Sequence, residues 1–120
     1  MSHRVTVRIT ENFSRNLDQI EEFLEGIEQS QQFEPLLDEL FDTVIPNLEQ
    51  FPFMGKDFLA ELPQSVESVM ILKKVRAKMP EKASIRQYLS KDYLILYLLH
   101  GEEIGLLAIK HHKQLYFNIR

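Results

Sequence analysis

The stretch that most constrains the fold is residues 93–112, which reads YLILYLLHGEEIGLLAIKHH. Its two halves, residues 93–100 and 104–109, contain no Lys, Arg, Asp or Glu. Segments of this length that are apolar on both faces are typical of strands in the middle of a sheet, covered on each side. Gly101 lies between them and can adopt the positive φ that a tight turn requires. The sequence therefore predicts a central hairpin that ends abruptly in the cationic and titratable segment KHHK, residues 110–113.

A chain of 120 residues, 44% hydrophobic and 27% charged, has the size and composition of one globular domain. It contains no cysteine, which excludes disulfides, thiolate nucleophiles and thiolate metal ligands. The first residues show no apolar run of signal-peptide length, and the longest uncharged stretch is far too short to cross a bilayer. We therefore expect a single domain over residues 1–120, located in the cytoplasm and with no membrane contact.

Charge is distributed unevenly along the chain. Residues 1–72 contain four Lys/Arg and fourteen Asp/Glu, a net charge of −10, whereas residues 73–120 contain ten and four, a net charge of +6. The total of −4 by itself argues against a nucleic-acid-binding protein. The asymmetry has two interpretations: acidic helices complemented by basic strand ends, or a basic surface for an anionic target.

The N-terminal part predicts a strand followed by a helical hairpin. Residues 3–9 alternate apolar and polar side chains, as a half-buried strand does. A helix capped by Thr10 or Asn12 follows, and its apolar stripe comprises Phe13, Leu17, Ile20, Leu24 and Ile27. A second amphipathic helix begins at residues 33–35. Pro46 predicts a kink in it, or an end to the regular helix just before that residue.

The C-terminal part predicts the sheet. Residues 65–78 favour a third helix with Val66, Val69, Met70 and Val75 facing inward, although residues 69–75 also fit a strand. A strand over residues 85–90, a turn at Lys91–Asp92 and the central hairpin follow. The apolar residues 115–119 are expected to add an edge strand or to pack on the core. This order indicates an α+β fold with a mostly antiparallel sheet of about four strands, in which the first strand lies beside the last central one.

Several short motifs follow this order of elements: T-x-x-F-x-x-x-L-x-x-I-x-x-F-L in residues 10–24, L-x-x-L in 37–40, F-P-x-M-G in 51–55, Y-x-I-x-Y in 93–97, and the closing segment 104–113. Together they resemble the RelE/ParE superfamily of toxins from bacterial toxin–antitoxin modules, often labelled plasmid stabilisation system proteins. The resemblance covers nearly the whole chain. It implies a helical hairpin packed on one face of an antiparallel sheet, and a cognate antitoxin that wraps and neutralises the toxin.

The superfamily is divided by target. RelE-like members cut mRNA in the ribosomal A site without a metal, and that resemblance implies that Arg86 and Lys110 bind phosphate and His112 transfers a proton. ParE-like members inhibit DNA gyrase and are not nucleases. In that comparison His111 and Lys113 match the closing motif, whereas Gln114 replaces an expected basic residue. The resemblance favours ribosome-dependent mRNA cleavage slightly over gyrase inhibition.

A different class of function is the alternative. The acidic total departs from the basic character usual in the nuclease members, and it favours a member that keeps the fold and binds a protein without toxin activity. The sequence leaves the oligomeric state open, a homodimer included.

The chemistry of metal-independent RNA cleavage limits which side chains can act together. Such cleavage needs a general base, a general acid and a cation at the phosphate, which His, Lys and Arg can supply. Strand alternation places Lys110 and His112 on one face of the sheet and His111 and Lys113 on the other. A single-face site is therefore either Lys110 and His112 with Arg86, or His111 with Lys113.

Neither a metal nor a cofactor is expected. His111 and His112 are adjacent on a predicted strand and should point apart, and no third ligand is evident in the sequence. The chain also lacks the sequence motifs of phosphate-binding loops, zincins and zinc fingers.

Overall fold

The computed structural model describes residues 5–61 and 66–114, so the predicted tail 115–119 and the first residues of the predicted strand 3–9 lie outside it. The elements are β1 (Thr6–Ile9), α1 (Glu11–Gly26), the 3₁₀ helix η1 (Ser30–Gln32), α2 (Phe33–Glu39), the π-helical turn η2 (Leu40–Val44), α3 (Ile45–Gln50), β2 (Lys56–Asp57), the 3₁₀ helix η3 (Leu59–Glu61), α4 (Val66–Lys78), β3 (Ser84–Ser90), β4 (Tyr93–His100) and β5 (Glu103–His111). The fold is α+β, as predicted from the sequence.

The strands form a five-stranded sheet in the order β1-β5-β4-β3-β2. β1 lies beside β5, as predicted for the first strand; it runs parallel to β5, and the other neighbours are antiparallel. The fifth strand is the two-residue β2, which comes from a segment predicted to be a loop. Gly101 adopts a φ of 61° in the turn between β4 and β5, where its lack of a side chain avoids strain.

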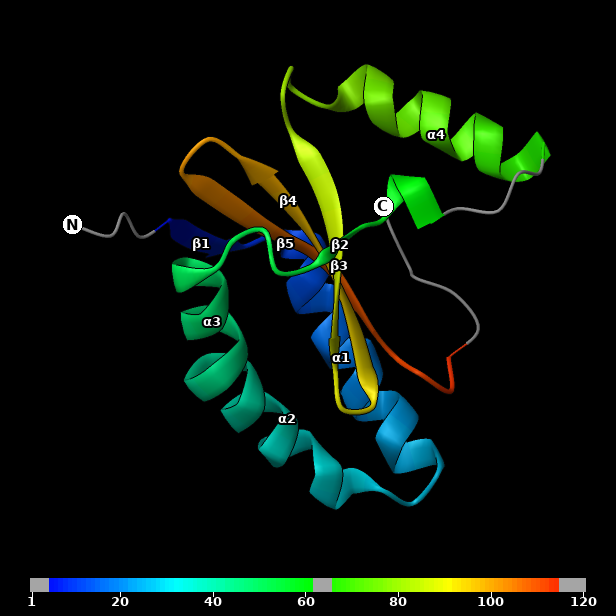
Figure 1. The fold of residues 1–120 in the computed structure, drawn as a ribbon. Coiled ribbons are helices and arrows are strands. Elements are labelled where there is room, and N and C mark those ends of the chain that lie inside the picture. Colours follow the sequence, from blue (N-terminus) through cyan, green and yellow to red (C-terminus); the bar gives the residue numbers. More distant parts are fainter. Residues whose placement is uncertain (1–4, 62–65, 115–120) are drawn as a thin grey trace.

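The helices α1, α2 and α3 pack together on one face of the sheet (Figure 1). Alternate residues of β4 enter the core beneath them, namely Tyr93, Ile95, Tyr97 and Leu99. The other face is apolar as well, but the side chain of Leu89 is 67% exposed there, and Leu94 and Leu98 are half-buried. The central strands are therefore apolar on both faces, as the sequence indicates, and these helices bury only one of the two.

The helix α4 confirms the predicted third helix and rules out the strand alternative for its residues. Its predicted inward face is wrong, because Val66, Val69 and Met70 are 80%, 47% and 55% exposed. The side chain of Val75 lies outside the described part. Figure 1 shows α4 projecting away from α2 and α3, so those helices do not cover Val66, Val69 and Met70. No helix in the described ranges is long and apolar enough to cross a membrane.

Local hydrogen bonds and Pro46 explain the ends of α1 and the irregular turn before α3. The Thr10 hydroxyl accepts a hydrogen bond from the Phe13 N–H at 3.2 Å, which makes Thr10 the N-cap of α1. The helix ends at Gly26, so Ile27 falls beyond it and is 36% exposed instead of continuing the buried stripe. Pro46 lies in the first turn of α3, and the preceding turn widens so that the Ile45 N–H donates to the Leu40 carbonyl. The predicted irregularity at this proline is therefore a π-helical turn.

A β-bulge in β5 sets the direction of every side chain at its C-terminal end. Leu96 of β4 pairs with Ala108, but the next residue, Tyr97, pairs with Leu106, so Leu107 has no partner across the ladder. One extra residue reverses the alternation of the strand. Ile109 and His111 consequently share the helix-covered face with Leu106, whereas Ala108 and Lys110 lie on the opposite face.

Polar side chains of α1 hold this bulge in place. β1 pairs with β5 only as far as Leu106. Beyond that point Asn12 donates to the Leu107 carbonyl at 2.9 Å, and the buried Asn16 accepts from the Ile109 N–H at 3.1 Å. The helix therefore takes the place of a strand along this part of the β5 edge, and it satisfies backbone groups that would otherwise be buried without partners.

We expect Asn16→Ala to lower the free energy of unfolding by about 1–3 kcal/mol, because the buried Ile109 N–H loses its acceptor. Denaturant unfolding followed by circular dichroism measures this change. Ser14→Ala, at an exposed position of the same helix, is the matched control and should have little effect. Equal stability of the two variants would contradict the role given to Asn16.

Candidate functional site

The C-terminal end of β5 brings four of the five predicted site residues together. His111 is buried, with 2% of its surface exposed, and its ring lies among three aromatic neighbours. The ring centroids of Phe23, Tyr93 and His112 are 5.5, 5.1 and 4.5 Å from that of His111. The bulge causes this burial, because it moves His111 to the face that α1 covers.

A tight turn after β5 is tied by hydrogen bonds to both the backbone and the imidazole of His111. The Lys113 N–H donates to Nδ1 of His111 at 3.1 Å, and the Gln114 N–H donates to the His111 carbonyl at 2.9 Å. The Gln114 side chain accepts in return from the His111 N–H at 2.8 Å. Because Nδ1 accepts a hydrogen bond, the proton of the neutral imidazole lies on Nε2. His111 thus acts as an anchor for the turn that follows it.

The turn between β3 and β4 completes the arrangement. The His112 N–H donates to the Asp92 carbonyl at 2.7 Å, and Nδ1 of His112 lies 3.7 Å from the Asp92 carboxylate. On the opposite face of the sheet, Lys110 donates to the Gln114 carbonyl at 2.9 Å. His112 and Lys113 are exposed. The end of β5 therefore presents cationic and titratable groups to solvent above one buried histidine.

Arg86 lies apart from this cluster. It pairs with Tyr97 in the sheet, whereas His111 pairs with Tyr93, four residues away along β4. At about 3.3 Å per residue this is a separation of roughly 13 Å along the strand, and two strand spacings add to it. Arg86 also shares the helix-covered face with Tyr97, whereas Lys110 lies on the opposite face. The single-face combination of Lys110 and His112 with Arg86 is therefore not formed.

The Arg86 guanidinium fixes the loop between α3 and β2. Its Nε donates to the Gly55 carbonyl at 2.8 Å, an Nη donates to the Phe53 carbonyl at 3.2 Å, and the group lies 5.3 Å from the Phe53 ring centroid. Tyr97 secures the same loop, since its hydroxyl donates to the Pro52 carbonyl and accepts from the Gly55 N–H. These contacts use two of the five N–H donors of the guanidinium and hold it against the loop.

Sequence reasoning missed the partners of this loop. A Cβ on Gly55 would lie 2.7 Å from the Tyr97 hydroxyl, so only glycine fits there. The F-P-x-M-G motif in residues 51–55 marked the loop but not its contacts with Tyr97 and Arg86. The buried Asn16 was missed as well, because a lone asparagine in an amphipathic helix carries no signal of a strand edge.

The expectation that His111 and His112 point apart is wrong. β5 ends at His111, so strand alternation does not extend to His112, and the two rings stack. Asp92 supplies a third side chain, and one potential ligand atom from each of the three lies within 4.8 Å of the others. Stacked rings do not aim their in-plane lone pairs at a common point, and Nδ1 of His111 already accepts a hydrogen bond. The three residues are thus close together without the geometry of a metal site.

Burial sets the protonation of His111. Desolvation lowers its pKa from the ordinary value of 6.5, and His112, Lys113 and Lys110 lower it further, while Asp92 acts in the opposite direction. Its neutral form is therefore the one that the folded protein favours at neutral pH.

The family model described as "ParE toxin of type II toxin-antitoxin system, parDE" matches residues 7–116. The chain belongs to the ParE toxin family. The predicted membership of the RelE/ParE superfamily is thus confirmed.

A solved structure shares the fold of this ParE family member. It is described as the chromosomal ParDE TA system from P. aeruginosa, and it is 17% identical with a TM-score of 0.57. The alignment covers 92% of this chain and 98% of that chain. No curated protein matches the sequence.

The lowered pKa of His111 predicts a loss of stability in acid. As the pH falls, the unfolded chain takes up the proton before the folded protein does. The contribution of His111 to the free energy of unfolding is therefore fully present above about pH 6.5 and is lost as the pH drops below that value. His111→Phe keeps an aromatic ring in place and should remove this part of the pH dependence. Urea unfolding between pH 7.5 and 5.5 measures it, with His100→Ala, an exposed histidine, as the control. A slope unchanged in His111→Phe would contradict the assignment.

Proposed function

We propose that this protein is the toxin of a parDE-type module, neutralised by a cognate antitoxin, and that it stops growth by binding DNA gyrase. The observation that carries the toxin assignment is the ParE toxin model, which matches residues 7–116. Gyrase as the target follows from what the family resemblance implies for ParE-like members. Cytoplasmic location is part of the proposal, because gyrase acts on the bacterial chromosome.

The arrangement of titratable groups supports binding over RNA cleavage. Cleavage needs a base, an acid and a cation within hydrogen-bond reach of one phosphate. Here the His111 ring is buried, and its Nδ1 accepts a hydrogen bond from the Lys113 N–H. Arg86 lies apart from the cluster and donates to two backbone carbonyls. His112 is the remaining candidate base, and its Nδ1 lies 3.7 Å from the carboxylate of Asp92. This set favours a surface that recognises its target without bond cleavage.

Each member of the cluster then has a distinct role. His111 is a positioning residue, because its Nδ1 and backbone hold the turn of residues 111–114. Lys113 and His112 are exposed on that turn and contact the target. Lys110 supports the turn through the Gln114 carbonyl. A rigid turn that carries exposed cations binds with little loss of conformational entropy.

We expect induced expression in bacteria to arrest growth, and Lys113→Glu to weaken the arrest. The substitution replaces a cation at the interface by an anion. We expect it to reduce target affinity on the order of tenfold, about 1.4 kcal/mol. Lys78→Glu, an exposed position on α4, makes the same charge change away from the turn and is the matched control. Colony counts after induction measure the effect.

Transcripts from the arrested cells distinguish the targets. Primer extension should show intact mRNA. New 5′ ends within coding regions would contradict the gyrase proposal and favour the RelE-like activity. Absence of growth arrest with soluble, folded protein would instead favour a protein-binding member without toxicity, which the net charge of −4 suits.

A further inference from the structure

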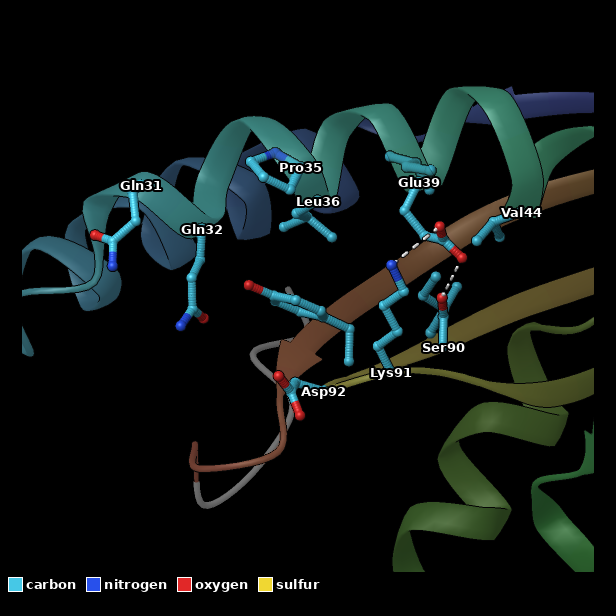
Figure 2. Close-up of a pocket in the computed structure, with 12 residues that line it drawn as sticks. Gln31, Gln32, Pro35, Leu36, Glu39, Val44, Ser90, Lys91 and Asp92 are labelled. Atoms are coloured by element: carbon cyan, nitrogen blue, oxygen red, sulfur yellow. Dashed lines mark hydrogen bonds and ion pairs between the residues drawn. The ribbon is translucent and has the colours of Figure 1, made fainter.

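A cavity of about 360 Å³ lies between α2 and the turn that joins β3 to β4. Its walls include the apolar side chains of Leu36, Leu40, Val44 and Ile95. Figure 2 shows Leu36 pointing from α2 toward the sheet, opposite the side chains of the β3–β4 turn. The volume falls at the lower end of the range of about 300–1,000 Å³ that is typical of small-molecule sites.

Tyr93 is one of the polar residues that line this cavity. It lines the wall with only 7% of its surface exposed, and its hydroxyl is buried without a hydrogen-bond partner among the described residues. Buried polar groups without a partner are rare in proteins, because the lost hydration is not replaced. Burial raises the pKa of Tyr93, and Asp92 raises it further, so the hydroxyl keeps its proton and can donate it to an acceptor.

The wall on the helix side is irregular for a physical reason. Leu40 and Val44 are the two ends of η2, the π-helical turn that precedes Pro46. Single π-helical turns are frequent where helices line functional sites. The Asn16 and Tyr97 hydrogen-bond networks described above do not involve this wall, so the cavity is a separate feature of the fold.

The charges at the rim limit what can enter. The Glu39 carboxylate contacts Lys91 at 3.6 Å and the Ser90 hydroxyl at 3.5 Å, as Figure 2 shows, and Asp92 adds a second carboxylate. Lys91 has a φ of 51°, a left-handed conformation that fixes the direction of this turn. Two carboxylates against one ammonium group disfavour an anionic ligand.

We propose that this cavity binds a small, uncharged, mostly apolar molecule that carries one hydrogen-bond acceptor, which receives the Tyr93 hydroxyl proton in a hydrogen bond. The apolar walls bind the body of the molecule, and the hydroxyl fixes its orientation. This inference does not depend on the identity of the toxin's target.

The position of the cavity connects it to the end of β5. The Tyr93 ring lies edge-on to His111 with centroids 5.1 Å apart, and the Asp92 carbonyl accepts from the His112 N–H. A ligand in the cavity therefore contacts two residues that also position the turn of residues 111–114. Binding is expected to perturb the His111 and His112 resonances without direct contact with them.

The test uses benzamide as the neutral probe and benzoate as its anionic counterpart, each titrated into the full chain. Amide shifts in ¹H–¹⁵N correlation spectra report binding. We expect benzamide to shift the amides of Leu36, Asp92 and Tyr93, and benzoate to bind more weakly. Tyr93→Phe should weaken benzamide about three- to tenfold, the effect of one hydrogen bond, without lowering the melting temperature. Tyr88→Phe, which alters a tyrosine outside the cavity, is the matched control and should bind as the wild type does.

A second variant tests the role of the cavity independently of the Tyr93 hydroxyl. Leu36→Phe fills the space and should abolish binding of benzamide while the protein remains folded. No response to benzamide, equal affinity for benzoate, or unchanged affinity in Tyr93→Phe would each overturn the proposal. Cavity amides that respond to rising protein concentration but not to benzamide would also overturn it, because a side chain from a second copy would then occupy the site.

Discussion

The hydrogen bonds between the polar side chains of α1 and the edge of β5 determine how the rest of this structure is arranged. β1 leaves the sheet after Ile9, and from there Asn12 and Asn16 bind the backbone of Leu107 and Ile109. A buried edge without such partners would be costly, since each unpaired backbone group loses its hydration. The same contacts stabilise the bulge at Leu107, and the bulge reverses the alternation of side chains beyond it. His111 is buried, and Lys110 faces the opposite side, because of this single extra residue.

Two features of the cluster follow from that reversal. The buried histidine becomes a structural support, whereas the exposed cations become the part that can meet another molecule. Arg86, the most versatile phosphate ligand among the predicted residues, is committed to the loop of residues 51–55 through the Gly55 and Phe53 carbonyls. A protein-binding surface requires neither proton transfer nor a preorganised phosphate site. The family match shows a ParE toxin, and the geometry supports the proposal that this toxin acts by binding its target.

Much of the fold could be predicted from the sequence, because hydrophobic periodicity reports directly on burial. Strands β3, β4 and β5 were predicted close to their observed positions, and Thr10 is one of the two N-caps that the sequence offered for α1. The side-chain directions at the end of β5 could not be predicted, because residues 104–109, IGLLAI, contain no polar side chain that would reveal a bulge in the alternation. The exposure of Val66 and Met70 on α4 was missed for a related reason: periodicity indicates a helix, but it does not say whether another layer exists to cover it. Arg86 was correctly placed on a strand, and its contacts depend on a loop thirty residues earlier that no local pattern connects to it.

The most direct test of the proposed activity is a supercoiling assay with purified DNA gyrase, relaxed plasmid and the purified protein. The proposed function predicts that the wild-type protein inhibits supercoiling, that Lys113→Glu inhibits it more weakly, and that Lys78→Glu behaves as the wild type. Full gyrase activity at protein concentrations well above that of the enzyme, together with cleavage of mRNA on programmed ribosomes, would contradict it.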